Sequence, residues 1–167
     1  QLVDPEDHPR FSELDVAANF QSLWAFPDDY IMKINLPVVG LARVQAMYPI
    51  GSLQRAGARI VGGSDWPVSS MNPLLAIETA VTRRDPSGLT PDALNEAEAM
   101  TLADMIEAYT ANGAYLAHRE DETGRLMPGY KADLVVLGAN LFTLAPSEIG
   151  EVPIVMTFFE GKKVYPK

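Results

Sequence analysis

The chain has 167 residues, of which 47% are hydrophobic and 21% charged, as in a globular protein of one domain, or of one domain with a small appendage. Its formal net charge of −9 repels phosphate backbones, so we expect no nucleic-acid partner. It has no cysteine, which excludes disulfides and thiolate zinc sites, and no apolar run of the roughly 18 residues that a membrane span needs, so we expect no membrane partner.

The first part of the chain is predicted to begin with a short helix around residues 10–14. A buried strand follows over residues 16–21. Helical spacing of apolar residues begins at Gly40 and is interrupted at Pro49. The second helical stretch ends at Gly57, because glycine accepts the left-handed conformation of a helix C-cap without penalty.

A second strand is predicted at residues 58–62. Pro73, suited to a first helical turn, opens a helix over residues 73–84. A further helix is predicted at residues 102–118, and Thr101 starts it in the manner of a capping box. Strands and helices thus alternate, which is typical of a parallel α/β architecture.

The composition changes after His118. A turn is predicted at Pro128–Gly129, followed by a strand over residues 132–137. Two further strands flank a tight turn at Glu160–Gly161, which indicates a hairpin. We therefore expect a first unit over residues 1–120 and an all-β unit over residues 121–167.

The stretch GARIVGGSDWPVSSMNP, residues 57–73, holds the strongest candidate for a functional residue, Asp65. In parallel α/β folds, functional residues gather where the carboxyl ends of the strands meet the loops. Gly62 and Gly63 permit close backbone approach at that point. Spacing alone leaves two alternatives open: Asp65 is a functional carboxylate, or it caps a turn.

Other candidates have weaker support. Ser64 lacks the second glycine of a nucleophile elbow, so a serine hydrolase is a minor alternative. Neither His8 nor His118 has a second histidine at helical spacing, so we expect no metal role for them. Gln21, Trp24 and Trp66 lie at predicted strand ends, where they could contact a substrate, although aromatic residues more often belong to the core.

Four blocks in order make the chain resemble a known family. They are GGSDWPV, NPLLAIETAVTR, MTLADMIEAYTANGAYLA and GRLMPGYKADLVVL. Together they resemble the carboxyl-terminal part of the amidohydrolase superfamily, and most closely its YtcJ-like branch, amidohydrolase family 3. The resemblance extends along nearly the whole chain.

The resemblance implies the carboxyl-terminal portion of a (β/α)8 TIM-type barrel over residues 1–120 and part of a small β-sandwich over residues 121–167. It implies that Asp65 binds a divalent metal, Zn²⁺, and accepts the proton of the attacking water. The intact enzyme would hydrolyse a C–N bond of a small amide-type substrate, and we expect it in the cytoplasm.

The family's H-x-H pair and its later histidines have no counterpart in this sequence. We therefore expect a fragment that begins just after the sixth strand, that binds no metal and is inactive by itself, and that self-associates through exposed edges. The alternative is a non-catalytic binding or assembly module that retains this part of the fold.

Overall fold

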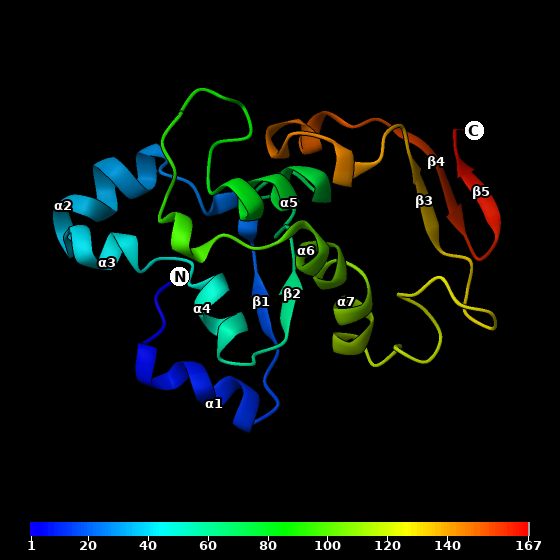
Figure 1. The fold of residues 1–167 in the computed structure, drawn as a ribbon, viewed down its shortest axis with the longest axis horizontal. Helices are drawn as coiled ribbons and strands as arrows, with labels where there is room; N and C mark the ends of the chain where they lie inside the picture. The colour runs from blue at the N-terminus through cyan, green and yellow to red at the C-terminus, as the bar shows by residue number, and fades with distance from the viewer. Residues whose placement is uncertain (167) are drawn as a thin grey trace.

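The computed structural model describes residues 1–166, and a two-stranded parallel sheet lies at the centre of its larger part (Figure 1). Strand β1 (Ala18–Phe20) pairs in parallel with strand β2 (Ile60–Gly62). Both strands are where the sequence predicted them but are shorter, because the ladder between them spans only three pairs of residues. The parallel pairing confirms the α/β architecture of this part.

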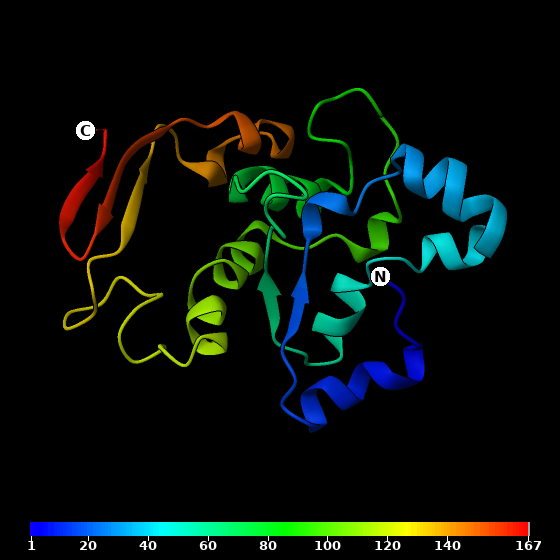
Figure 2. The ribbon, with the colours of Figure 1, turned by 180° about the vertical axis from the view of Figure 1, so that it is seen from behind.

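Short helices surround this sheet. The α-helices are α1 (His8–Glu13), α2 (Leu36–Val39), α3 (Leu41–Gln45), α4 (Ile50–Arg55), α5 (Pro73–Thr82), α6 (Leu102–Ala108) and α7 (Ala111–Leu116). The 3-10 helices are η1 (Pro5–Asp7), η2 (Ser22–Trp24), η4 (Glu96–Glu98), η5 (Leu141–Thr143) and η6 (Pro146–Glu151), and η3 (Tyr30–Asn35) is a π-helix. Helices α4, α6 and α7 pack against β2, and the two views show α4 on one flank of the strand pair and α6 and α7 on the other (Figures 1 and 2).

The predicted end of the helical stretch at Gly57 is confirmed. Gly57 has φ of +89°, and its N–H donates to the Gln54 carbonyl at 2.9 Å. The next N–H, of Ala58, donates to the Leu53 carbonyl at 3.0 Å, which completes a Schellman motif. Helices η3 and α2 were not predicted, because Ile31 is their single buried side chain and leaves little amphipathic signal.

The single helix predicted over residues 102–118 is wrong. The structure has two helices, α6 and α7, separated by Tyr109 and Thr110. Thr110 leaves the helical conformation, with φ of −127° and ψ of −91°, and its hydroxyl donates to the Ile106 carbonyl at 2.7 Å. The predicted cap at the start is present, since the Thr101 hydroxyl accepts from the Asp104 N–H at 3.2 Å.

The end of the chain forms an antiparallel sheet of β3 (Leu134–Leu137), β4 (Ile154–Phe159) and β5 (Lys162–Tyr165), in that spatial order. The predicted hairpin is confirmed, because Glu160 and Gly161 both have positive φ, 47° and 77°, as a tight two-residue turn requires. In the chain segment that connects β3 to β4, η6 packs closely against α5. The division of the chain at residue 120 stays a prediction.

Arg83, directly after α5, is fully buried. Its Nε donates to the Leu94 carbonyl at 2.8 Å, and its two terminal nitrogens donate to the carbonyls of Tyr48 at 3.2 Å and Met47 at 3.1 Å. Burial lowers the pKa of Arg83 to about 10. One side chain therefore satisfies three backbone carbonyls from two other segments of the chain.

Glu78 joins α5 to η6. Its side chain is buried, and its carboxylate accepts a hydrogen bond from the Gly150 N–H at 2.7 Å. Burial raises the pKa of Glu78 above its ordinary value of 4.5, because the charged form is poorly solvated there.

Replacing Glu78 by glutamine keeps an acceptor for Gly150 and removes the charge. Because the pKa is raised on folding, the free energy of unfolding of the unmodified chain falls as the pH rises from 4.5 through the folded-state pKa. We expect Glu78→Gln to be more stable than the unmodified chain at neutral pH, and the two to converge in acid. Urea unfolding at both pH values measures this, with the exposed Glu107→Gln as control. A variant less stable at neutral pH would contradict the expectation.

Candidate functional site

Asp65 lies in the loop that follows the carboxyl end of β2. Its φ is +51°, and its carbonyl accepts from the Val68 N–H at 2.8 Å, which closes the turn through the backbone. The Ser69 hydroxyl braces the same turn by donating to the Ser64 carbonyl at 2.6 Å. Within residues 1–166 the exposed Asp65 carboxylate forms neither a hydrogen bond nor an ion pair. Its side chain therefore does not cap the turn, and its oxygens are open to an external partner.

The two glycines before Asp65 are sites of close approach, as expected. A Cβ at Gly62 would lie 2.3 Å from the ring of Tyr109, so only glycine fits under that ring. The Tyr109 hydroxyl donates to the Gly63 carbonyl at 3.4 Å, and burial raises the pKa of Tyr109. The Gly63 N–H donates to the Phe20 carbonyl at 3.0 Å and ties the start of the loop to β1. The carboxyl ends of both strands are thereby held together beneath Asp65.

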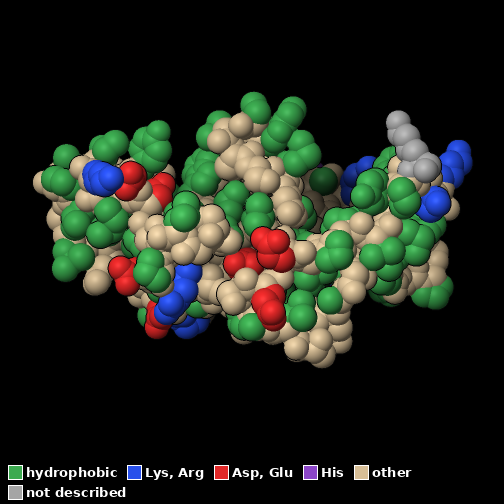
Figure 3. All heavy atoms as spheres, turned by 90° about the horizontal axis from the view of Figure 1, so that it is seen from above, with side chains coloured by type: hydrophobic (Ala, Val, Ile, Leu, Met, Phe, Trp, Pro, Cys, Tyr) green, Lys and Arg blue, Asp and Glu red, His purple; other side chains and the backbone are tan. Residues whose placement is uncertain are grey.

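The structure brings two of the three predicted contact residues together. Gln21 and Trp24, both half-buried, line a cavity of about 210 Å³ beside β1. Tyr48 lines the same cavity, and burial raises its pKa to about 12. Trp66 lies apart from it in the loop of Asp65 and is 62% exposed. Figure 3 looks onto the carboxyl ends of β1 and β2 and shows many apolar side chains exposed on this side of the molecule.

The sequence analysis missed Asn19, which also lines this cavity. Asn19 is the middle residue of β1 and is exposed. Asparagine is depleted in strands, and this is the one signal that could have drawn attention to the position.

The weaker candidates do not assemble into a site. The Ser64 hydroxyl accepts from the Trp66 N–H at 3.2 Å, and no histidine among residues 1–166 hydrogen-bonds to it. His8 opens α1 and His118 follows α7, on separate elements. Across the described part of the chain, no group of three or more His, Asp or Glu side chains could hold a metal ion. None of the helices described is long and apolar enough to cross a membrane.

The model of the amidohydrolase family matches residues 1–165. The chain is 28% identical over 167 residues to the putative amidohydrolase YtcJ of Bacillus subtilis, covering 100% of this chain and 31% of that protein. It is 32% identical over 168 residues to the protein LONG AFTER FAR-RED 3 of Arabidopsis thaliana, covering 99% of this chain and 28% of that one. It is 32% identical over 117 residues to the N-substituted formamide deformylase of Arthrobacter pascens, covering 69% of this chain and 21% of that protein.

Solved structures share the fold. An uncharacterized metal-dependent hydrolase from Pyrococcus horikoshii superposes with a TM-score of 0.71 and 24% identity, over 89% of this chain and 29% of that chain. An amidohydrolase from Thermotoga maritima superposes with a TM-score of 0.64 and 18% identity, over 98% of this chain and 35% of that chain. The chain thus has the α/β fold of part of these hydrolases and spans about a third or less of the relatives' length.

Proposed function

The chain belongs to the amidohydrolase family, and from this we propose that it is the part of a metal-dependent hydrolase that contributes Asp65 to the active site. The observation that carries the proposal is the position of Asp65, in the loop after the carboxyl end of β2, with a carboxylate that is unpaired within residues 1–166. Functional groups of parallel α/β enzymes lie at that end of the strands. In this proposal β1 and β2 are the seventh and eighth strands of a (β/α)8 barrel, and residues 121–167 form part of a β-sandwich.

The described residues do not fit a metal ion by themselves. A catalytic zinc site takes three protein ligands, and no such group exists among residues 1–166. We therefore assign no catalytic step to a metal in this chain alone. The proposed role of Asp65 is to join ligands from elsewhere in a longer polypeptide, with Zn²⁺ as the proposed ion, and to accept the proton of the attacking water.

The proposed reaction is hydrolysis of a C–N bond in a small amide-type substrate. One of the relatives is an N-substituted formamide deformylase, which supports this class of substrate. Gln21, Trp24 and Trp66 are the proposed substrate contacts, because they lie in the segments that follow β1 and β2.

The proposal has a direct test on the isolated chain and on a hybrid protein. In the hybrid, residues 1–167 replace the matching 31% of the Bacillus subtilis YtcJ protein. We expect the isolated chain to hold no stoichiometric zinc and to hydrolyse no amide from a panel of N-substituted formamides and cyclic amides. We expect the hybrid to hold zinc and to hydrolyse at least one of them. Hydrolysis by the isolated chain with zinc bound would contradict the proposal.

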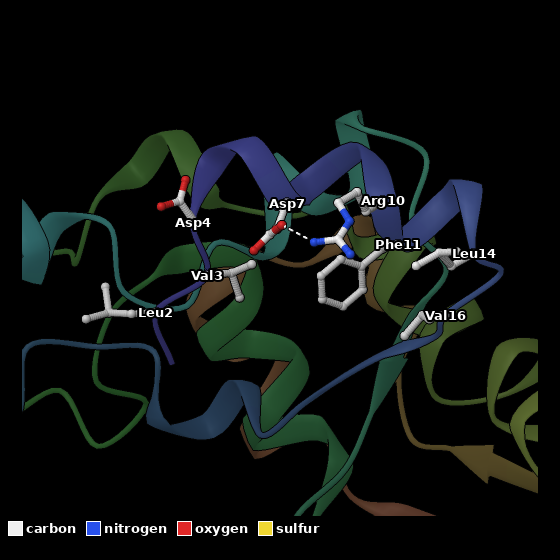
Figure 4. A pocket seen from close by; sticks show the side chains of 8 residues that line it. All are labelled: Leu2, Val3, Asp4, Asp7, Arg10, Phe11, Leu14 and Val16. Atoms are coloured by element: carbon white, nitrogen blue, oxygen red, sulfur yellow. Dashed lines mark hydrogen bonds and ion pairs between the residues drawn. The ribbon is translucent and has the colours of Figure 1, made fainter.

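Self-association of the isolated chain is a further part of this proposal. Within residues 1–166, β1 pairs only with β2, so its other edge is open. Beside the start of β1 lies a cavity of about 370 Å³ (Figure 4). Apolar side chains dominate its lining, and the ion pair of Asp7 with Arg10, 2.6 Å long, lies at its rim. An open edge beside an apolar hollow favours pairing with a second copy of the chain.

Leu14 provides the test of this association, because it lines the cavity and is 64% exposed. We expect the unmodified chain to elute as a dimer or larger species and Leu14→Glu to shift it toward monomer. The matched control is Leu89→Glu, which changes a side chain 87% exposed in another loop and should leave the mass unchanged. Light scattering coupled to size exclusion gives the masses, and a monomeric unmodified chain would contradict the expectation.

A further inference from the structure

Two side-chain amides converge on Gly63 from the neighbouring strand. A Cβ at Gly63 would lie 2.8 Å from Asn19 Oδ1 and 3.4 Å from Gln21 Nε2. Gly63, two residues before Asp65, thus allows both amides to lie close to its backbone. A side chain at Gly63 would displace the Asn19 amide from this position at the carboxyl end of β2.

Both amides have unused hydrogen-bonding capacity. In the described part of the chain, neither the Asn19 nor the Gln21 side chain forms a hydrogen bond with another protein group. Each carboxamide carries two N–H donors and one carbonyl acceptor. Asn19 is also exposed, although it is the middle residue of β1. A strand gains nothing in stability from an asparagine at such a position.

The cavity of about 210 Å³ beside these amides has an apolar wall. Trp24 and Phe20 line it together with Tyr48, so one part of the cavity is polar and another is apolar. Small-molecule sites have this character, with apolar walls and a few polar groups that fix the orientation of the ligand.

We propose that Asn19 and Gln21 bind the amide group of a secondary amide whose apolar substituent lies against Trp24. The ligand carbonyl accepts from a carboxamide N–H, and the ligand N–H donates to a carboxamide oxygen. This inference rests on the proposed function, because it identifies the substrate class as amides that retain an N–H. Asn19 becomes a specificity residue of the same site as Asp65.

Binding of a model amide to the isolated chain tests the inference without any catalysis. The probes are N-benzylacetamide, N-benzyl-N-methylacetamide and benzyl acetate, of which only the first has an N–H. Titrations followed by saturation-transfer difference NMR give dissociation constants whether or not the chain self-associates. We expect N-benzylacetamide to bind about 3- to 10-fold more tightly than either analogue, as loss of one hydrogen bond predicts.

Three variants locate the site. Asn19→Leu and Gln21→Met each remove one amide at nearly constant volume, and each should weaken N-benzylacetamide about 3- to 10-fold. Gly63→Ala should weaken it similarly, because the new methyl group displaces both amides while meeting only flexible side-chain ends. The matched control is Gln45→Met, an exposed amide in α3 that should change binding less than about twofold.

Equal binding of the three probes would overturn the inference, as would unchanged binding in Asn19→Leu and Gln21→Met. If Gly63→Ala fails to fold, Asn19→Leu and Gln21→Met decide the outcome. The result is separable from that of the proposed function. If the isolated chain binds N-benzylacetamide preferentially but the hybrid holds no zinc, the proposed function is wrong and the amide-binding site stands. If the hybrid holds zinc but the isolated chain binds the three probes equally, the proposed function stands and the amide-binding site is wrong.

Discussion

In the YtcJ hybrid, Asp65→Asn is expected to lower kcat/KM for the best amide substrate by about 10²- to 10⁴-fold, the usual contribution of a general base. Asparagine has nearly the same shape but cannot accept a proton from water. The carboxylate has no hydrogen-bond partner within residues 1–166, so the change removes no internal contact. The hybrid should therefore remain folded, and circular dichroism checks this.

The control for Asp65 is Asp92→Asn. Asp92 is an exposed aspartate in the loop between α5 and η4. Its replacement should leave kcat/KM unchanged within about twofold, as for a surface change away from the site. An equal loss in both variants, or full activity of Asp65→Asn, would contradict the assignment of Asp65.

Arg83→Met is expected to destabilise the chain by about 2–5 kcal/mol, because each hydrogen bond from a charged donor contributes about 1.5–3 kcal/mol. The methionine fills much of the volume but removes the donors to the Met47 and Leu94 carbonyls, whereas the Tyr48 carbonyl still accepts from the Ile50 N–H at 2.8 Å. Buried carbonyls without donors carry the full cost of desolvation. Urea unfolding at neutral pH measures the loss.

The neighbouring Arg84 provides a matched control. Its side chain is 50% exposed and forms an ion pair of 2.9 Å with Glu96. Arg84→Met should cost no more than about 1 kcal/mol, as is usual for exposed pairs. Similar costs for Arg83→Met and Arg84→Met would show that the buried guanidinium does not organise the core as described.

Local sequence signals predicted the elements whose geometry is local. The hairpin around Glu160–Gly161 depends on two adjacent residues with positive φ, and the helix end at Gly57 depends on one glycine. The apolar run before Gly62 likewise placed β2 and the turn of Asp65. These features could be predicted because neighbouring residues determine them.

Features that depend on distant contacts escaped prediction. The apolar spacing continues from Met105 to Tyr109, so it gave no sign that the helix ends at Tyr109, whose ring packs against Gly62 in another element. Asn19 was missed for the same reason, since its significance lies in its approach to Gly63 on the neighbouring strand. Tertiary contact, rather than local propensity, decides both positions.

The most direct measurement is the zinc affinity of the hybrid with and without Asp65→Asn, by equilibrium dialysis and elemental analysis. The account predicts stoichiometric zinc in the unmodified hybrid and an affinity at least about tenfold weaker in the variant, since even outer-shell changes cost that much. Equal zinc affinity in the two folded proteins would contradict the claim that this chain contributes Asp65 to the metal site.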